Sequence, residues 1–330
     1  MYRSHGCVFE VTRACHDHAE GLQSRSLVLL PHGRRTAPSD QRVPPMSLPV
    51  QPLHFQPLHF CWAALHPRPR GVVVFIGGAF FGTFPTVFYR RFLSLLHAQG
   101  YTLVALPFRF SFRHWSIALS LVAYQDELRR ELAELATRLG HAPDPYVDWK
   151  PFTWIGHSLG CKYLALLELL SDLELDALRR ALADCVGADQ AGRLIAALSS
   201  EPLDHQSLHN QPTLLLDPVM ADLEGAVPLP LLQKLLNRWI RVLPSRSESF
   251  CIVGNSRLFN LTSIVGFGSR LATATVASFV DLLGPRLRHL IRLEPRDHLA
   301  IMGVGHTDME VVAAVSDWLN QEPAWHASGE

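Results

Sequence analysis

The sequence lacks net charge and is poor in lysine. Its 330 residues carry 30 Lys and Arg against 30 Asp and Glu, and only Lys150, Lys162 and Lys234 are lysines. Without a basic excess, nothing in the composition indicates a nucleic-acid partner. Apolar residues make up 48% of the chain and charged residues 18%. This balance is typical of a folded protein with a large core and not of a disordered chain.

No CxxC pair occurs among the six cysteines, so zinc-ribbon and dithiol redox motifs are absent. We expect no metal site and no cofactor. Scattered cysteines are most simply small buried hydrophobic side chains, kept as thiols in a reducing, cytoplasmic compartment. They are Cys7, Cys15, Cys61, Cys161, Cys185 and Cys251.

The chain also lacks a clear membrane segment, and no signal peptide opens it. Residues 71–89 hold no charge, but they include four glycines and Pro85. A buried strand that runs into a glycine-rich loop explains this composition better than a transmembrane helix. Peripheral attachment to a membrane surface stays compatible with the sequence.

Residues 1–45 differ from the rest because they show no apolar periodicity. We expect this segment to be disordered or an over-extended reading frame, with Met46 as the native start. Residues 46–330 then form the folded domain.

From residue 71 onward, apolar β-branched runs alternate with amphipathic segments. This order predicts an α/β protein with a mostly parallel sheet and helices on both faces. Polar or leucine-rich inserts near 171–210 and 219–247 are candidates for a helical cap. The strands are expected at 56–65, 72–76, 101–106, 152–156, 212–216, 250–253 and 289–293, and the helices at 86–99, 121–139, 161–170, 231–240, 271–283 and 308–319.

The pentapeptide Gly156-His157-Ser158-Leu159-Gly160 matches G-x-S-x-G. It stands between a predicted strand and a predicted helix, which is the context of a nucleophile elbow. In such a turn the serine hydroxyl is lifted above the carboxyl edge of the sheet, close to the positive end of the new helix. Ser158 is therefore the candidate nucleophile.

A nucleophilic serine needs N–H donors for the oxyanion. In an elbow one donor is the residue after the nucleophile, here Leu159. The second comes from the glycine-rich loop after residues 72–76, where Ala79 and Phe80 are the candidates. The glycines of this loop also allow it to pack closely against the elbow helix, and both roles are compatible.

Two histidines follow the last predicted strand and are candidates for the general base. His298 comes soon after the strand, where this base is expected, and His306 precedes the final helix within a Gly-His pair. Position in the loop favours His298 over His306.

The acid is the weakest element of the pattern. Chain order requires it between the serine and the histidine, but the loop after the strand expected at 250–253 has no carboxylate and offers Asn255 and Ser256. Asp217 ends the strand expected at 212–216 and is the candidate for this role. A turn-forming Asp-Pro pair explains Asp217 equally well.

Several segments resemble the uncharacterised family called domain of unknown function 1350, found in cyanobacteria and plastid-bearing eukaryotes. The likeness covers residues 58–170 and recurs around 297–299. It implies an α/β-hydrolase-like fold, Ser158 and His298 as the site residues, and a start at Met46. The family pattern has aspartates after the 250–253 strand, where this chain has Ser256 and Arg257. The segments that carry the resemblance are 75–85, 88–90, 100–101, 105–108 and 156–162.

Two functions follow from these residues. One is a serine hydrolase of the esterase or lipase kind, or an acyltransferase, acting on an ester, thioester or amide, with a lipophilic acyl group favoured by the leucine-rich insert. The other is a non-catalytic hydrolase-fold protein that binds a lipid or a partner through the same pocket, which the missing acid favours. The sequence does not indicate an oligomeric state.

Overall fold

The computed structural model describes residues 53–148, 150, 152–198, 208, 211–220, 242–303 and 307–322. Residues 49–330 form one compact unit. The segment 1–45 and the helix expected at 231–240 lie outside the described residues.

An eight-stranded sheet forms the centre of this unit, in the order β1-β2-β4-β3-β5-β6-β7-β8. Strands β3 to β8 pair in parallel, and β1 and β2 add an antiparallel edge. The strands are β1 (Gln56–Pro57), β2 (Trp62–Ala64), β3 (Gly71–Ile76), β4 (Tyr101–Leu106), β5 (Phe152–His157), β6 (Thr213–Leu216), β7 (Thr262–Gly266) and β8 (His289–Arg292).

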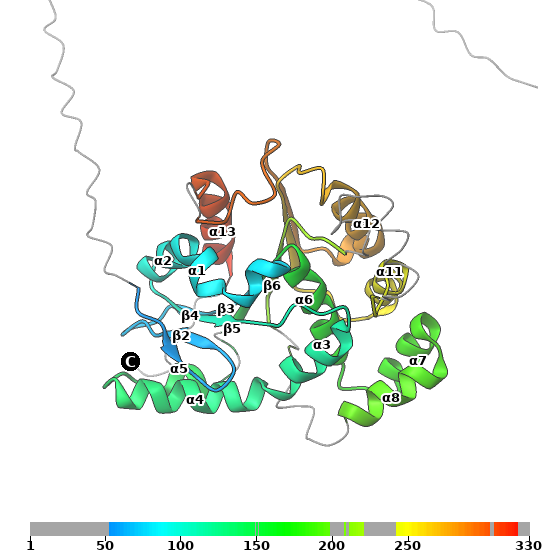
Figure 1. The fold of residues 1–330 in the computed structure, drawn as a ribbon, viewed down its shortest axis with the longest axis horizontal. Helices are drawn as coiled ribbons and strands as arrows, with labels where there is room; N and C mark the ends of the chain where they lie inside the picture. The colour runs from blue at the N-terminus through cyan, green and yellow to red at the C-terminus, as the bar shows by residue number, and fades with distance from the viewer. Residues whose placement is uncertain are drawn as a thin grey trace, which may run out of the picture. The chain divides into compact units, whose positions relative to one another are not determined.

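Helices cover both faces of the sheet (Figure 1). The α-helices are α1 (Pro85–Phe88), α2 (Arg90–Ala98), α3 (His114–Ala123), α4 (Gln125–Arg138), α5 (Asp144–Val147), α6 (Leu159–Leu170), α7 (Leu175–Val186), α8 (Ala188–Leu198), α11 (Arg246–Asn255), α12 (Thr273–Leu283) and α13 (Met309–Gln321). Two short 3₁₀ turns are η1 (Phe80–Thr83) and η3 (Gly284–Arg286).

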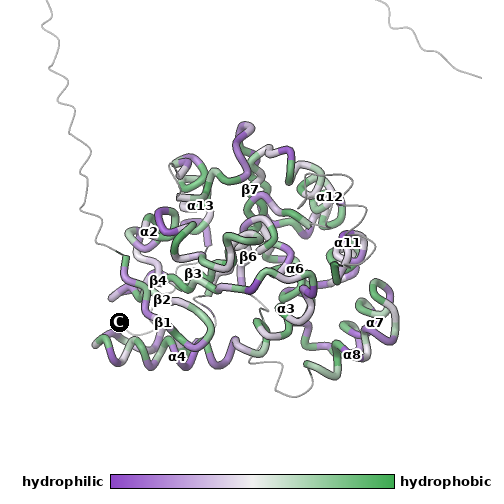
Figure 2. The backbone as a smooth tube through the Cα atoms, viewed as in Figure 1, coloured by the Kyte–Doolittle hydropathy of each residue, from purple (hydrophilic) through white to green (hydrophobic). Residues whose placement is uncertain are grey.

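Alternation along the buried strands separates two hydrophobic cores. In β3, Val72 and Val74 point into the core that contains α3, α4 and α6, whereas Val73 and Phe75 point into the core with α2 and α13. Successive strand residues face opposite sides, so a run buried on both faces needs apolar residues at every position. Figure 2 shows this as hydrophobic strands between helices of mixed hydropathy.

Two expected helices are interrupted. The helix expected at 86–99 is divided at Tyr89 into α1 and α2, and the one expected at 121–139 is preceded by α3 and starts at Gln125. The helices are divided at Tyr89 and Tyr124. The apolar spacing does not reveal these breaks, because both tyrosines are buried like the apolar residues around them.

The strand expected at 250–253 is wrong, because these residues belong to α11. Ser245 caps that helix in a capping box with Glu248, each side chain bonding the other's backbone N–H. This Ser-x-x-Glu pattern marks a helix start, and the sequence interpretation overlooked it. The strand at this place in the sheet is β7, whose residues Thr262 and Ser263 conceal its strand pattern.

The first insert, near 171–210, forms α7 and α8, which pack on each other. A disulfide joins Cys185 at the end of α7 to Cys251 in α11. The expectation of free thiols is therefore wrong for this pair, while Cys61 and Cys161 are buried thiols. Sequence spacing gave no sign of the pair because its members are 66 residues apart. Most of the second insert lies outside the described residues.

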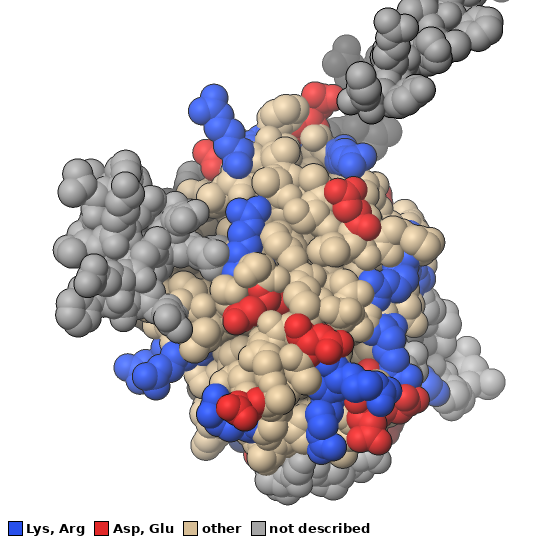
Figure 3. Space-filling view, turned by 90° about the vertical axis from the view of Figure 1, so that its right-hand side faces the viewer, with Lys and Arg blue, Asp and Glu red and all other residues tan. Residues whose placement is uncertain are grey.

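The surface carries charges of both signs. Figure 3 shows the face on the right-hand side of Figure 1, where basic and acidic side chains are interspersed and neither forms a continuous area. In the described part of the chain, no helix has the length and apolar character needed to cross a membrane.

Candidate active site

Ser158 stands in a sharp turn between β5 and α6. Its backbone angles, φ 56° and ψ −119°, lie in a region that residues other than glycine rarely adopt. The turn is crowded on the side of β3: a Cβ added at Gly160 would lie 2.2 Å from the carbonyl oxygen of Ile76. One at Gly156 would meet Leu164 at 2.9 Å. Glycine is therefore required at position 160, where backbone blocks a side chain, and a side chain at position 156 would have to displace Leu164, in keeping with the small residues of a nucleophile elbow.

His298 lies in the loop after β8, with its imidazole between two partners. Its Nε2 is 2.8 Å from Ser158 Oγ, and its Nδ1 is 2.6 Å from Asp217 Oδ2. The loop is held by a turn in which the Asp297 carboxylate accepts the N–H of Leu299 at 2.8 Å. The alternative base, His306, lies outside the described residues.

Asp217 follows β6 and is fully buried. Its Oδ1 accepts the N–H of Phe267 at 2.9 Å, and its Oδ2 accepts the hydroxyl of Ser269 at 2.5 Å. Both donors belong to the loop after β7. The structure thus brings Ser158, His298 and Asp217 together. The carboxylate directly follows β6, and the loop after β7 donates two hydrogen bonds to it.

Asn255 and Ser256, the residues offered by the loop after the expected 250–253 strand, lie elsewhere. Asn255 ends α11, and its Nδ2 contacts the sulfur atoms of Cys185 and Cys251 at 3.3 and 3.2 Å. Asn255 and Ser256 do not lie beside His298, because residues 246–255 form the helix α11 and not a strand of the sheet.

The amides of the loop after β3 are unequally available. The N–H of Gly78 donates to the hydroxyl of Tyr89 at 2.8 Å and is therefore already used. Ala79 and Phe80 follow at the start of η1. Leu159 is the first residue of α6, so its N–H has no acceptor in a preceding helical turn. The loop lies against Ser158, because a Cβ added at Gly78 would be 2.9 Å from Ser158 Cβ.

Sequence reasoning did not find Tyr89, Ser269 or the role of His157 in the site. His157 is almost completely buried, and burial, together with the neighbouring His298, lowers its pKa to about 3. Its Nδ1 lies 2.9 Å from the Tyr89 hydroxyl, and its Nε2 lies 2.9 Å from the carbonyl oxygen of His298. No local motif marks Tyr89 or Ser269, since each reaches the site only through the fold.

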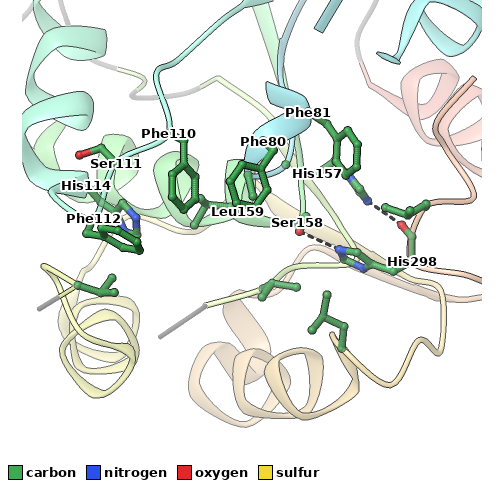
Figure 4. A pocket seen from close by; sticks show the side chains of 16 residues that line it. Phe80, Phe81, Phe110, Ser111, Phe112, His114, His157, Ser158, Leu159 and His298 are labelled. Carbon is green, nitrogen blue, oxygen red and sulfur yellow. Dashed lines mark hydrogen bonds between the residues drawn. The ribbon is translucent and has the colours of Figure 1, made fainter. Parts of the chain in front are cut away.

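A cavity of about 280 Å³ opens beside Ser158 (Figure 4). The rings of Phe80 and Phe110 stack with centroids 4.3 Å apart along one wall, and Phe112 and His114 lie beyond them. None of the described lining residues is Asp, Glu, Lys or Arg. The lining consists of Gly78, Ala79, Phe80, Phe81, Phe110, Ser111, Phe112, His114, His157, Ser158, Leu159, Val219, Val242, Leu271, His298 and Leu299.

Neither α7 nor α8 contributes to this lining, whereas Val219 and Val242, on either side of the undescribed part of the second insert, do. Among the described residues, no three His, Cys, Asp or Glu side chains are grouped so as to hold a metal ion.

One protein-family model matches the segment that contains the turn at Ser158. Residues 54–181 match the family described as protein of unknown function (DUF1350). The resemblance noted in the sequence is thereby confirmed. The matched range includes the loop at Gly78 and the elbow at Ser158, and it ends before Asp217 and His298. None of the curated proteins matches the chain.

Solved structures extend the likeness to most of the chain. The butyrate-bound esterase Est2 of the planctomycete Thermogutta terrifontis superposes with a TM-score of 0.51 at 14% identity, covering 85% of this chain and 98% of that one. The same esterase phosphorylated by paraoxon gives a TM-score of 0.50 at 13% identity, covering 81% and 90%. At such identities the likeness concerns the fold. The chain has the α/β-hydrolase fold, as the sequence predicted.

Proposed function

We propose that this protein is a serine hydrolase that cleaves uncharged carboxylic esters. One observation carries the proposal: an unbroken hydrogen-bonded series joins Asp217, His298 and Ser158, with 2.6 Å and 2.8 Å between the paired atoms, at the edge of a cavity. This is the arrangement by which a serine hydroxyl is activated for attack.

In the proposed reaction, Ser158 Oγ attacks the ester carbonyl carbon while its proton passes to His298 Nε2. The Asp217 carboxylate stabilises the imidazolium that forms. Amides of Leu159 and of Ala79 or Phe80 donate to the oxyanion. The C–O bond of the ester then breaks, and the leaving alkoxide takes the proton from His298.

The acyl group now esterifies Ser158, and a second nucleophile must release it. A water molecule that loses its proton to His298 gives the acid and restores the serine. An alcohol in the same place would instead give a new ester, so the same residues support acyl transfer.

The cavity favours an apolar, uncharged acyl group. Its described walls carry four phenylalanines and no side chain of Asp, Glu, Lys or Arg, and placing a carboxylate there would remove it from water without a partner. A volume of about 280 Å³ lies near the lower end of ligand pockets. We infer a preference for short or medium lipophilic acyl groups.

The non-catalytic alternative depended on a missing acid. That argument used the loop after residues 250–253, which is the end of a helix, and Asp217 lies within hydrogen-bonding distance of His298. No specific observation now favours a binding protein over an enzyme.

A fluorophosphonate probe, which reacts with activated serines, tests the proposal. We expect labelling of the wild type, its loss in Ser158→Ala, and much slower labelling in His298→Ala. Ser278→Ala is the control, because Ser278 lies on the exposed face of α12. Folded wild-type protein that resists the probe and hydrolyses no p-nitrophenyl ester from acetate to decanoate would overturn the proposal.

A further inference from the structure

The directions of three hydrogen bonds around His157 follow from chemistry alone. Its Nε2 faces the carbonyl oxygen of His298 at 2.9 Å, and a carbonyl only accepts. Nε2 must therefore carry the proton. Because burial keeps this imidazole neutral, Nδ1 has a lone pair and accepts the hydroxyl proton of Tyr89 at 2.9 Å.

The Tyr89 hydroxyl continues the same series. It donates to His157 and accepts the N–H of Gly78 at 2.8 Å. Tyr89 is fully buried, and burial raises the pKa of its hydroxyl, which keeps the proton that it donates. All donors thus point one way, from Gly78 through Tyr89 and His157 to His298, an arrangement in which each bond polarises the next.

The two ends of this series belong to different parts of the proposed machinery. Gly78 immediately precedes Ala79 in the loop that would hold the oxyanion, and His298 is the proposed base. His157 itself directly precedes Ser158. Its ring lies 4.9 Å from the ring of His298 and stacks on Phe267 at 6.1 Å, so it has little freedom to turn.

We propose that His157 and Tyr89 are positioning residues that hold the oxyanion loop and the base loop at a set separation on either side of Ser158. The proposal rests on the hydrolase function proposed above. Neither side chain touches the reacting atoms. Their effect on rate is geometric, since a displacement of about 1 Å in a catalytic group costs on the order of 10²-fold.

Two substitutions of His157 each remove one of its two hydrogen bonds and keep the other. In His157→Asn the amide oxygen replaces Nδ1 and still accepts from Tyr89, but the donor to His298 is lost. In His157→Gln the amide nitrogen replaces Nε2 and still donates to His298, but the acceptor for Tyr89 is lost. We expect each to lower kcat by about 10- to 100-fold with KM nearly unchanged.

The split between kcat and KM is the readout for both variants, because a side chain that only supports the core would lower the melting temperature without lowering kcat measured well below it. Tyr89→Phe should lower kcat as His157→Gln does, because both remove the hydrogen bond between Tyr89 and His157. The double variant Tyr89→Phe/His157→Gln should have a kcat no lower than that of the less active single variant.

Tyr146→Phe is the matched control for Tyr89→Phe. Tyr146 is also fully buried, and its hydroxyl pairs with Thr102 Oγ1 at 2.9 Å, at the start of β4 and away from the site. Both variants should lower the melting temperature by about 2–4 °C. Only Tyr89→Phe should lower kcat, by about 10-fold measured well below the melting temperature.

The outcomes separate the two proposals. Equal kcat values in Tyr89→Phe and Tyr146→Phe, together with a wild-type kcat in His157→Asn, would show that the series only supports the core. Wild-type protein without hydrolysis or Ser158 labelling would instead overturn the hydrolase function itself.

Discussion

At the scale of single residues, Asp217 has the most constrained environment in the site. It is one of three described non-glycine residues with a positive φ, here 45°. Its own N–H donates to Val265, and its carboxylate accepts from Phe267 and Ser269 in the next loop. The same residue stands in a turn and places its carboxylate 2.6 Å from His298 Nδ1. Its catalytic role stays a prediction.

Asp217→Asn tests that role. The amide keeps the size of the side chain but removes the charge that would stabilise an imidazolium, so we expect kcat to fall by about 10⁴-fold. The measurement is hydrolysis of a p-nitrophenyl ester at neutral pH. Asp297→Asn is the control, because this exposed neighbour of His298 contacts the loop backbone and not the imidazole. A variant of Asp217 that keeps a tenth of the activity would contradict the assignment.

Glu168 lies in α6, and its carboxyl group is buried. Its Oε1 accepts from Thr262 at 3.3 Å, and burial raises its pKa from 4.5 to about 8 despite hydrogen bonds from Thr262 and Thr213. Between these two pH values the folded protein keeps a proton that the unfolded chain releases. The free energy of unfolding therefore falls as the pH rises from 4.5 to 8.

Glu168→Gln removes this titration while keeping a hydrogen-bonding side chain. We expect the variant to be more stable than the wild type above pH 8, on the order of 1–3 kcal/mol, and nearly equal to it at pH 4.5. Urea unfolding across this range measures the difference, with exposed Glu134→Gln as control. A gain that is independent of pH would show that Glu168 does not carry the raised pKa.

At the scale of elements, the close approach of α6 to β3 determines where Ser158, directly before α6, lies relative to the sheet. This approach requires glycine at position 160, whose added Cβ would also lie 2.7 Å from the carbonyl oxygen of Gly77. Since backbone atoms of a central strand cannot yield as a flexible side chain can, the helix itself would have to move.

Gly160→Ala should therefore destabilise the protein by more than about 3 kcal/mol or prevent soluble expression. Gly192→Ala is the matched control, because Gly192 lies in α8 with no heavy atom within 4 Å of an added Cβ. There alanine should stabilise the helix by about 0.5–1 kcal/mol. Similar melting temperatures for the two variants would contradict this account of the elbow.

At the scale of the whole molecule, the disulfide between Cys185 and Cys251 ties the α7–α8 insert to the main unit through α11. Closing a loop of this length restricts the unfolded chain, so its removal should lower the free energy of unfolding by about 2–4 kcal/mol. Urea unfolding of wild type with and without reductant measures this difference.

Cys185→Ser/Cys251→Ser supplies the control for that experiment. The double variant should match the reduced wild type, and reductant should not change it further. An equal response of both proteins to reductant would assign the effect to other thiols.

The mostly parallel sheet with helices on both faces was predictable, because the alternation of strands and helices follows from short-range pattern. Apolar β-branched runs and amphipathic segments alternate, and the α/β-hydrolase fold predicted from them is confirmed. The pattern failed at β7, where the polar Thr262 and Ser263 are buried beside only two large apolar residues, and at α11, where the apolar residues 250–253 form part of a helix.

The sequence by itself determined the elbow, because a strand, a G-x-S-x-G turn and a helix are adjacent along the chain and need only local geometry. Only the tertiary structure decided which carboxylate faces His298 and which groups hold it there. Asp217 follows β6 and Ser269 lies in the loop after β7, and they meet because the carboxyl ends of these parallel strands are in register. Tyr89, between α1 and α2, reaches His157 at the end of β5 through the packing of these helices on the sheet. Contacts between residues 50 or more positions apart depend on that register and that packing, which no local pattern encodes.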